Sequence, residues 1–201
     1  MRAFEWPHIV RALRDLHGLT PEQFALMVDV TAEVVNRWEA GQAIPESQQQ
    51  AILRDLLSGH FNHHPTFLGL KAMVRGMGEI STLYMPGMVV HTISSPLERW
   101  LAPHRLTIVG TSILPKLDGT TGEMIERHAL PMLAGKSDVL ALSYTDLSVA
   151  DRRTVMRRTL SVVPIDGVRA MVLTDRILDQ SDQHAAPDLD LQIVTADSVR
   201  E

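Results

Sequence analysis

Residues 20–41 read TPEQFALMVDVTAEVVNRWEAG, and this stretch decides how the N-terminal part of the chain folds. Thr20 is a good helix cap, a proline follows it at the first helical position, and Gln23 completes a capping box. Thr31 is a second cap, and Gly41 is a typical residue at a helix end. The stretch therefore predicts two short helices joined by a very short turn.

The flanking sequence predicts further short helices. Apolar residues at helical spacing predict one helix before the stretch (Ile9, Val10, Leu13 and Leu16), and another begins near Pro45. Such short helices are not stable alone, so we expect the first 65 residues to pack into a compact all-helical unit. Residues 58–64 have the composition of a linker, and a connecting helix with Phe67, Leu70 and Val74 on one face follows them.

The quoted stretch resembles the XRE/Cro-type helix-turn-helix family nearly position by position, over Leu19–Ala25 and Val30–Gly41. Ala25 matches the small residue at which the two helices approach each other, and Val35 matches an apolar position that supports the turn. Asp29 stands where the family usually has glycine in a left-handed turn, a conformation that aspartate tolerates better than most residues. Pro21 and Ala32 replace polar residues that often contact DNA in this family, which thins the usual set of contacts.

The resemblance implies that residues 31–40 form a recognition helix in the major groove of operator DNA. Arg37 is suited to guanine, Asn36 to adenine and Glu33 to cytosine. Hydroxyl groups and backbone amides at the two helix starts are suited to phosphate. The expected DNA-binding residues are Thr20, Thr31, Ala32, Glu33, Asn36 and Arg37.

Charge argues against tight binding by one copy of the chain. The whole chain has a formal net charge of −5, and residues 1–65 carry five basic and eight acidic groups. Basic excess is the usual mark of a strong nucleic-acid binder. We therefore expect a homodimer on a two-fold operator, and a protein-interaction adaptor with a repurposed helix-turn-helix stays open as the alternative.

Composition and the absence of known motifs exclude several classes of protein. The 201 residues are 45% hydrophobic and include no cysteine, which fits a globular protein without disulfides or cysteine-bound metal. The sequence shows neither a membrane-length apolar run nor a signal peptide, so we expect a cytoplasmic protein without a membrane partner. It contains no nucleophile-elbow, Walker or dinucleotide-binding glycine pattern, and we expect no enzyme activity, no catalytic residues and no metal site.

Beyond about residue 80 the sequence predicts an α+β domain with a mostly antiparallel sheet. The expected strands are 81–85, 89–93, 106–109, 139–144, 159–164 and 169–174, and Asp166-Gly167 marks a hairpin turn. A short helix is expected at 95–101 and a longer one at 122–133. The sequence looks like a PAS domain at Val89–Leu97, Ile108–Ser112 and Val172–Ile177. In that family, two strands, short helices, a longer helix and three antiparallel strands follow one another.

The full expectation is an all-α helix-turn-helix unit joined to a PAS-like α+β domain. The expected divisions are 1–58 for the helix-turn-helix domain, 59–79 for the linker and connecting helix, 80–180 for a sensor or dimerisation domain, and 181–201 for an acidic, loosely ordered tail. The PAS resemblance implies a ligand pocket between the sheet and the helix at 122–133, with Met124, His128, Met132 and Leu133 as candidates. No sequence feature identifies a ligand or cofactor.

Other side chains that could bind a metal, haem or phosphate have simpler structural interpretations. His128 leaves haem binding open as an alternative, although a lone helical histidine is more often structural. His60, His63 and His64 are interpreted as solvated linker residues rather than as metal ligands. The cluster of Arg152, Arg153, Arg157 and Arg158 is interpreted as a solvated strand edge.

Overall fold

The computed structural model describes residues 5–117, 119–148, 154–165, 168–178 and 190–199. Five helices come first: α1 Glu5–Leu16, α2 Pro21–Met27, α3 Ala32–Glu39, α4 Ser47–His63 and α5 Pro65–Gly76. They are followed by β1 Ile80–Met85, β2 Val89–Ile93, α6 Ser95–Leu101, α7 Gly119–Met124, α8 Leu130–Leu133, β3 Val139–Leu147, β4 Val155–Ile165, β5 Val168–Ile177 and β6 Gln192–Thr195. Within the described ranges, no helix is long and apolar enough to cross a membrane.

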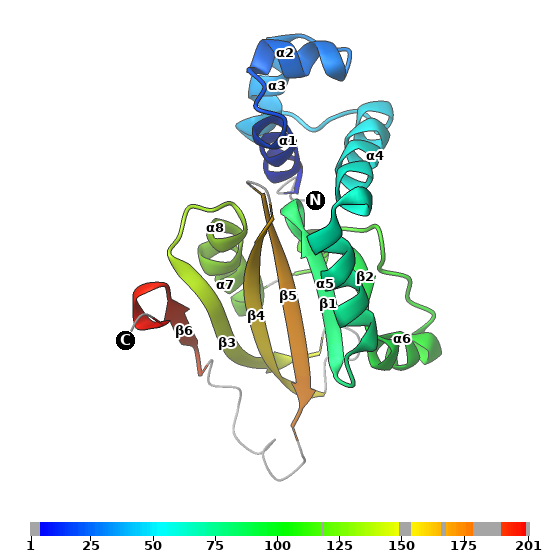
Figure 1. Cartoon of the computed structure of the whole chain (residues 1–201), viewed down its shortest axis with the longest axis vertical. Coiled ribbons are helices and arrows are strands. Elements are labelled where there is room, and N and C mark those ends of the chain that lie inside the picture. The colour runs from blue at the N-terminus through cyan, green and yellow to red at the C-terminus, as the bar shows by residue number, and fades with distance from the viewer. Residues whose placement is uncertain (1–4, 118, 149–153, 166–167, 179–189, 200–201) are drawn as a thin grey trace.

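The strands form one antiparallel sheet in the order β2-β1-β5-β4-β3-β6 (Figure 1). We call the face that packs against α7 and α8 the inner face, and the face that packs against α1 and α5 the outer face. Side chains alternate between the two faces, so Tyr84 and Leu173 belong to the inner core while Leu83 and Val172 belong to the outer one. Ile165 pairs with Val168, which is the pairing that the expected hairpin requires, although residues 166–167 lie outside the described residues.

The helical unit and the sheet share one hydrophobic core. Buried residues of α1 such as Ile9 and Leu13 belong to the same cluster as Leu83, Met85 and Val172 of the sheet. Helix α5 lies across β1 on the outer face, and its Phe67 and Val74 are fully buried. The connecting helix and its buried face are therefore confirmed.

Three expectations about local structure are wrong. Residues 58–63 continue α4 instead of forming a linker, because Gly59 keeps a negative φ and the first proline that can stop the helix is Pro65. Residues 106–109 form no strand, since left-handed φ values at Arg105 (52°) and Gly110 (81°) break the extended backbone on both sides.

The expectation of a loosely ordered tail is also wrong for part of its length. Residues 192–195 form β6 and pair with β3 at the sheet edge, with Ile193 opposite Leu142. Residues 179–189 of the tail lie outside the described residues. Helix 122–133 is present but longer, beginning with α7 at Gly119 and containing a π-helical turn at Ile125–Ala129 before α8.

Candidate functional site

A tight turn sets the angle between α2 and α3. Asp29 has a φ of 55°, which is the left-handed conformation that the sequence predicts at this position. The N–H of Val30 then donates to the carbonyl of Ala25 at 3.0 Å, and that of Val28 donates to Phe24 at 3.2 Å. These two bonds close the end of α2, so the chain enters α3 without an intervening loop.

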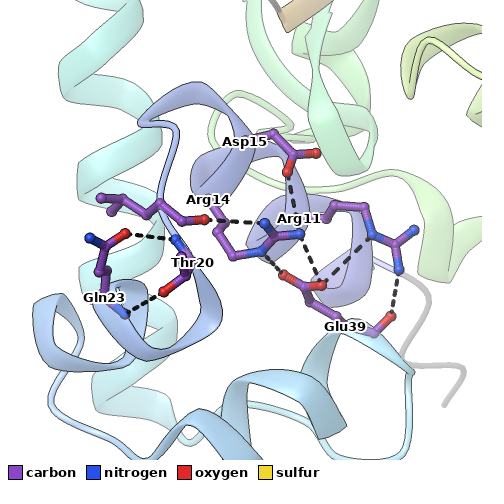
Figure 2. A network of polar contacts seen from close by, with 7 residues as sticks. Arg11, Arg14, Asp15, Thr20, Gln23 and Glu39 are labelled. Carbon is purple, nitrogen blue, oxygen red and sulfur yellow. Dashed lines mark hydrogen bonds and ion pairs between the residues drawn. The ribbon is translucent and has the colours of Figure 1, made fainter.

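Each of the two helices begins at a threonine cap. The Thr20 hydroxyl accepts from the N–H of Gln23 at 3.3 Å, and the Gln23 side chain accepts from the N–H of Thr20 at 2.9 Å (Figure 2). The Thr31 hydroxyl accepts from the N–H of Val34 at 3.4 Å. Hydrogen bonds from its own backbone N–H and from Thr20 lower the pKa of Glu22, so a carboxylate stands at the start of α2.

A charge cluster fixes α3 against α1. Arg14 Nε donates to Glu39 Oε1 at 2.6 Å, and Arg14 also donates to the carbonyl of Leu19 at 3.2 Å. Arg11 donates to the backbone carbonyl of Glu39 at 3.2 Å, with its Nε 3.9 Å from Glu39 Oε2 (Figure 2). We call Arg11, Arg14 and Glu39 the α1–α3 clamp. Both arginines of the clamp contact Glu39, so their guanidinium groups hold α3 against α1.

The expected base-reading side chains lie on the free side of α3. Glu33, Asn36 and Arg37 are exposed, while Val35 and Trp38 on the opposite side are buried. Ala32 is half-buried, and the caps Thr20 and Thr31 are exposed. Helices α2 and α3 lie at the end of the molecule away from the sheet (Figure 1). The structure therefore brings the six expected residues to one exposed end of the molecule.

This surface has little positive charge, and α2 exposes two large apolar side chains, Leu26 and Met27. Arg37 is the one cation in the sequences of α2 and α3. Leu26 on α2 is 83% exposed, at a place where nothing in the described part of the chain covers it. Phosphate contact at this surface would depend mainly on backbone amides and helix starts.

A second candidate site lies on the inner face of the sheet. A cavity of about 370 Å³ opens between the sheet, α6 and the segment at 106–116. Its walls are mainly apolar, with Leu97, Trp100 and Leu101 from α6 and Ile108 and Ile113 from the segment.

Two buried charged residues lie on the strands that form the floor of this cavity. Arg158 on β4 and Asp175 on β5 are directly opposite each other in the sheet and both line the cavity. Their side chains are 7% and 10% exposed, and Arg158 Nε lies 3.9 Å from Asp175 Oδ1. That separation is an ion pair but is too long for a hydrogen bond.

The Arg158–Asp175 ion pair leaves some of its hydrogen-bonding atoms without a partner among the described residues. Arg158 Nη2 donates to the carbonyl of Leu147 at 3.1 Å. Arg158 Nε and Asp175 Oδ1 are buried without any hydrogen-bond partner among the described residues. Burial raises the pKa of Asp175 to about 6, although the neighbouring guanidinium acts in the opposite direction.

The four residues expected to line a pocket lie elsewhere on the inner face. Met124 and Met132 are buried in the inner core, and Leu133 also lines a smaller cavity of about 90 Å³ beside α1. His128 is half-buried within the π-helical turn. The structure does not bring these four together with the Arg158–Asp175 cavity, and their role as ligand contacts stays a prediction.

The interpretation of the arginine cluster as a solvated edge is wrong for Arg158. Strand β4 lies between β5 and β3, so it is an internal strand, and its residue Arg158 faces the inner side with Met156 and Leu160. Arg157 faces the other side and forms an ion pair with Asp190 at 2.7 Å. The alternation of Arg158 with apolar residues is the sequence signal that identifies its buried position. Arg152 and Arg153 lie outside the described residues.

The described ranges contain no group of three or more histidine, aspartate and glutamate side chains able to hold a metal ion. His63 is exposed at the end of α4, and His64 is the residue before α5.

Comparison with known proteins finds similarities in both parts of the chain. The family model described as "Helix-turn-helix" matches residues 10–48. The PAS domain of BvgS from Bordetella pertussis is similar over 58% of this chain and 90% of that chain, at 8% identity and a TM-score of 0.44. A PAS domain of an HTR-like protein from Haloarcula marismortui is similar over 56% and 92%, at 13% identity and a TM-score of 0.36. A search of curated protein sequences finds no match to this chain.

The C-terminal part has the element order that the PAS resemblance implies, with β1 and β2, then the helices, then β3 to β5 in antiparallel pairing. Residues 10–48 match the helix-turn-helix family model, and the α+β domain that follows them has the order of strands and helices expected from the PAS resemblance.

Proposed function

We propose that this protein is a transcriptional regulator in which α3 reads operator DNA and the PAS-like domain responds to a small molecule. The observation that carries the first half is the exposure of Glu33, Asn36 and Arg37 on the side of α3 opposite its buried Val35 and Trp38. The helix that must enter the major groove is free to do so, and its side chains match base edges. The helix-turn-helix family match over residues 10–48 supports the same assignment.

The active form is proposed to be a homodimer. With both Arg11 and Arg14 engaged in the α1–α3 clamp, one copy has few cations left for phosphate. Two copies double the contacts and would place their recognition helices in half-sites about 34 Å apart. The proposed functional divisions are 1–58, 59–79 and 80–180, although α4 runs across the first of these boundaries to His63. A ligand that favours one dimer geometry would change the spacing that the two helices present.

The test begins with selection of preferred duplexes from a random library by the full-length protein. Binding of the selected duplex is then measured by fluorescence anisotropy at several salt concentrations. We expect affinity to fall steeply with salt, and Arg37→Ala and Asn36→Ala to weaken binding by roughly tenfold to a hundredfold and relax the base preference. Arg75→Ala is the matched control, since it removes one exposed cation from α5 at a distance from α3. An unchanged base preference in Arg37→Ala would refute the base-contact assignment.

A second substitution tests the phosphate contacts separately. The carboxylate of Glu22 stands at the start of α2, where a phosphate would bind. We expect Glu22→Gln to raise affinity for all duplexes equally, because the change removes repulsion without altering a base contact. Unchanged affinity would mean that α2 does not approach the DNA backbone, and a fall in affinity would mean that the Glu22 carboxylate itself makes a favourable contact.

The adaptor function remains the second candidate, and the 83% exposure of Leu26 is the observation that favours it. An apolar side chain on α2 is more useful in a protein contact than next to phosphate. The adaptor function would be favoured over the regulator if the protein bound no DNA duplex at low salt and if Leu26→Ser abolished its binding to a protein partner. The oligomeric state, measured by light scattering with and without DNA, tests the dimer independently.

A further inference from the structure

The cavity on the inner face is lined by a buried pair of opposite charges and by several apolar side chains. Arg158 and Asp175 lie on its floor, whereas α6 contributes Leu97, Trp100 and Leu101 to its walls. A volume of about 370 Å³ lies within the range of small-molecule sites. The cavity is therefore suited to a molecule with an apolar body and a single polar head.

The two unpartnered atoms on the floor define what that head must do. Arg158 Nε is a donor that needs an acceptor, and Asp175 Oδ1 is an acceptor that needs a donor. A buried charged group without its hydrogen bond is costly, so a molecule that supplies both partners gains from each contact. Since the two atoms are 3.9 Å apart, the donor and the acceptor must be close neighbours in the ligand.

Charge restricts the head further. A carboxylate head would satisfy Arg158 but would face the like charge of Asp175, and an ammonium head would satisfy Asp175 but would face Arg158. Asp146 on β3 also acts on this region electrostatically, and its carboxylate accepts from the hydroxyl of Thr121. A neutral head avoids both repulsions. The carboxamide group fits, because its oxygen and its nitrogen are bonded to the same carbon and one N–H points to the same side as the carbonyl oxygen.

We propose that this cavity binds a neutral amide with an apolar body, its carbonyl accepting from Arg158 Nε and its N–H donating to Asp175 Oδ1. Cyclic amides share this arrangement of donor and acceptor and belong to the same class. The proposal deepens the sensor half of the proposed function and rests on it, but the binding step itself requires no DNA. The half-buried Trp100 offers a flat apolar surface for the body of the ligand.

The test uses the full-length protein and four probes that share a phenyl body: phenylacetamide, phenylacetate, phenethylamine and ethylbenzene. Dissociation constants are measured by ligand-observed nuclear magnetic resonance titration. We expect phenylacetamide to bind at least about tenfold more tightly than each of the other three. Equal or tighter binding of phenylacetate would show that the cations lining the cavity, Arg158 and Lys116, outweigh Asp175, and equal binding of ethylbenzene would show that the polar pair makes no contact; either result overturns the proposal.

Substitutions provide the second arm. Arg158→Lys keeps the charge but removes Nε, and Asp175→Asn keeps the shape but removes the charge; each is expected to reduce the preference for the amide over ethylbenzene by about tenfold. Arg157→Lys is the matched control on the same strand, since Arg157 faces the outer side. If a variant fails to fold, the four-probe comparison on the unaltered protein still decides the proposal.

The outcomes separate the two proposals. DNA binding without amide preference would leave the regulator intact and remove the ligand assignment. Amide preference without salt-dependent DNA binding would leave the ligand site intact and remove the regulator. Amide binding that leaves DNA affinity and half-site spacing unchanged would confirm the site but contradict its role as a sensor.

Discussion

Replacing Glu39 by glutamine removes one negative charge from the α1–α3 clamp while keeping almost the same side-chain shape. The Glu39 carboxylate lies 2.6 Å from Arg14 Nε and 3.9 Å from Arg11 Nε, and its side chain is 13% exposed. The substitution leaves two guanidinium groups next to a neutral amide. Since α3 packs on α1 partly through this contact, we expect the helical unit to lose stability.

The magnitude follows from the burial of the clamp. Exposed ion pairs contribute about 0–1 kcal/mol, whereas hydrogen bonds to charged groups contribute about 1.5–3 kcal/mol when shielded from water. The Arg14 side chain is 21% exposed, so the pair belongs nearer the shielded case. We expect Glu39→Gln to reduce the free energy of unfolding by about 2 kcal/mol, and the double-mutant cycle with Arg14→Gln to give a coupling of about 1–1.5 kcal/mol.

The assay is urea unfolding followed by tryptophan fluorescence. Trp6 and Trp38 are 2% and 3% exposed within the helical unit, so a Trp100→Phe background leaves a signal from this unit alone. Glu33→Gln is the matched control, because this carboxylate is exposed on the opposite side of α3. A loss below about 0.5 kcal/mol for Glu39→Gln, or a coupling near zero, would refute the reasoning that the clamp is shielded and cooperative.

Substitutions at three further positions test the turn, a buried hydroxyl and a half-buried histidine. Because Asp29 has a φ of 55°, we expect Asp29→Gly to raise the free energy of unfolding by about 0.5–1 kcal/mol and Asp29→Val to lower it. Urea unfolding measures both changes, and a loss of stability in Asp29→Gly would contradict the reasoning. Ser94→Ala is expected to cost about 2 kcal/mol, because its hydroxyl accepts from Ser81 N–H at 2.9 Å and donates to the Glu79 carbonyl at 2.8 Å; thermal unfolding measures the loss, which should exceed that of a surface serine. Burial lowers the pKa of His91 to about 4, so the unfolded chain binds its proton first and stability falls as pH drops from 6.5 through 4; His91→Gln should flatten this part of the stability–pH curve, and an unchanged curve would contradict the reasoning.

The helix-turn-helix could be predicted from sequence because its signals are local. Thr20 with Gln23, Thr31 and Asp29 each determine the backbone within a few residues, and the structure places a cap or a left-handed turn at every one of them. The end of α4 could not be predicted from the composition of residues 58–64, since the packing of neighbouring helices permits a glycine and several polar residues within a helix.

The cavity could not be predicted for a different reason. Arg158 and Asp175 meet because β4 and β5 pair in the register that sets them opposite each other, and neither residue has a local signal for that pairing. The sequence did contain the apolar alternation on either side of Arg158, but its neighbours in the arginine cluster suggested a solvated edge. Sequence reasoning expected a pocket between the sheet and the helix at 122–133, whereas the cavity with Arg158 and Asp175 lies between the sheet, α6 and the segment at 106–116, and a ligand role for the residues of that helix stays a prediction.

The core shared between α1 and the outer face of the sheet has a practical consequence for anyone who wishes to build hybrid proteins. Cutting the chain before β1 would leave Leu83, Met85 and Val172 uncovered on the sheet fragment and Ile9 and Leu13 uncovered on the helical fragment. Both halves would then tend to aggregate when expressed alone. Grafting the helical unit onto a foreign domain would succeed only if the recipient supplied an apolar surface of matching shape, so the two parts must be exchanged together or redesigned at their shared interface.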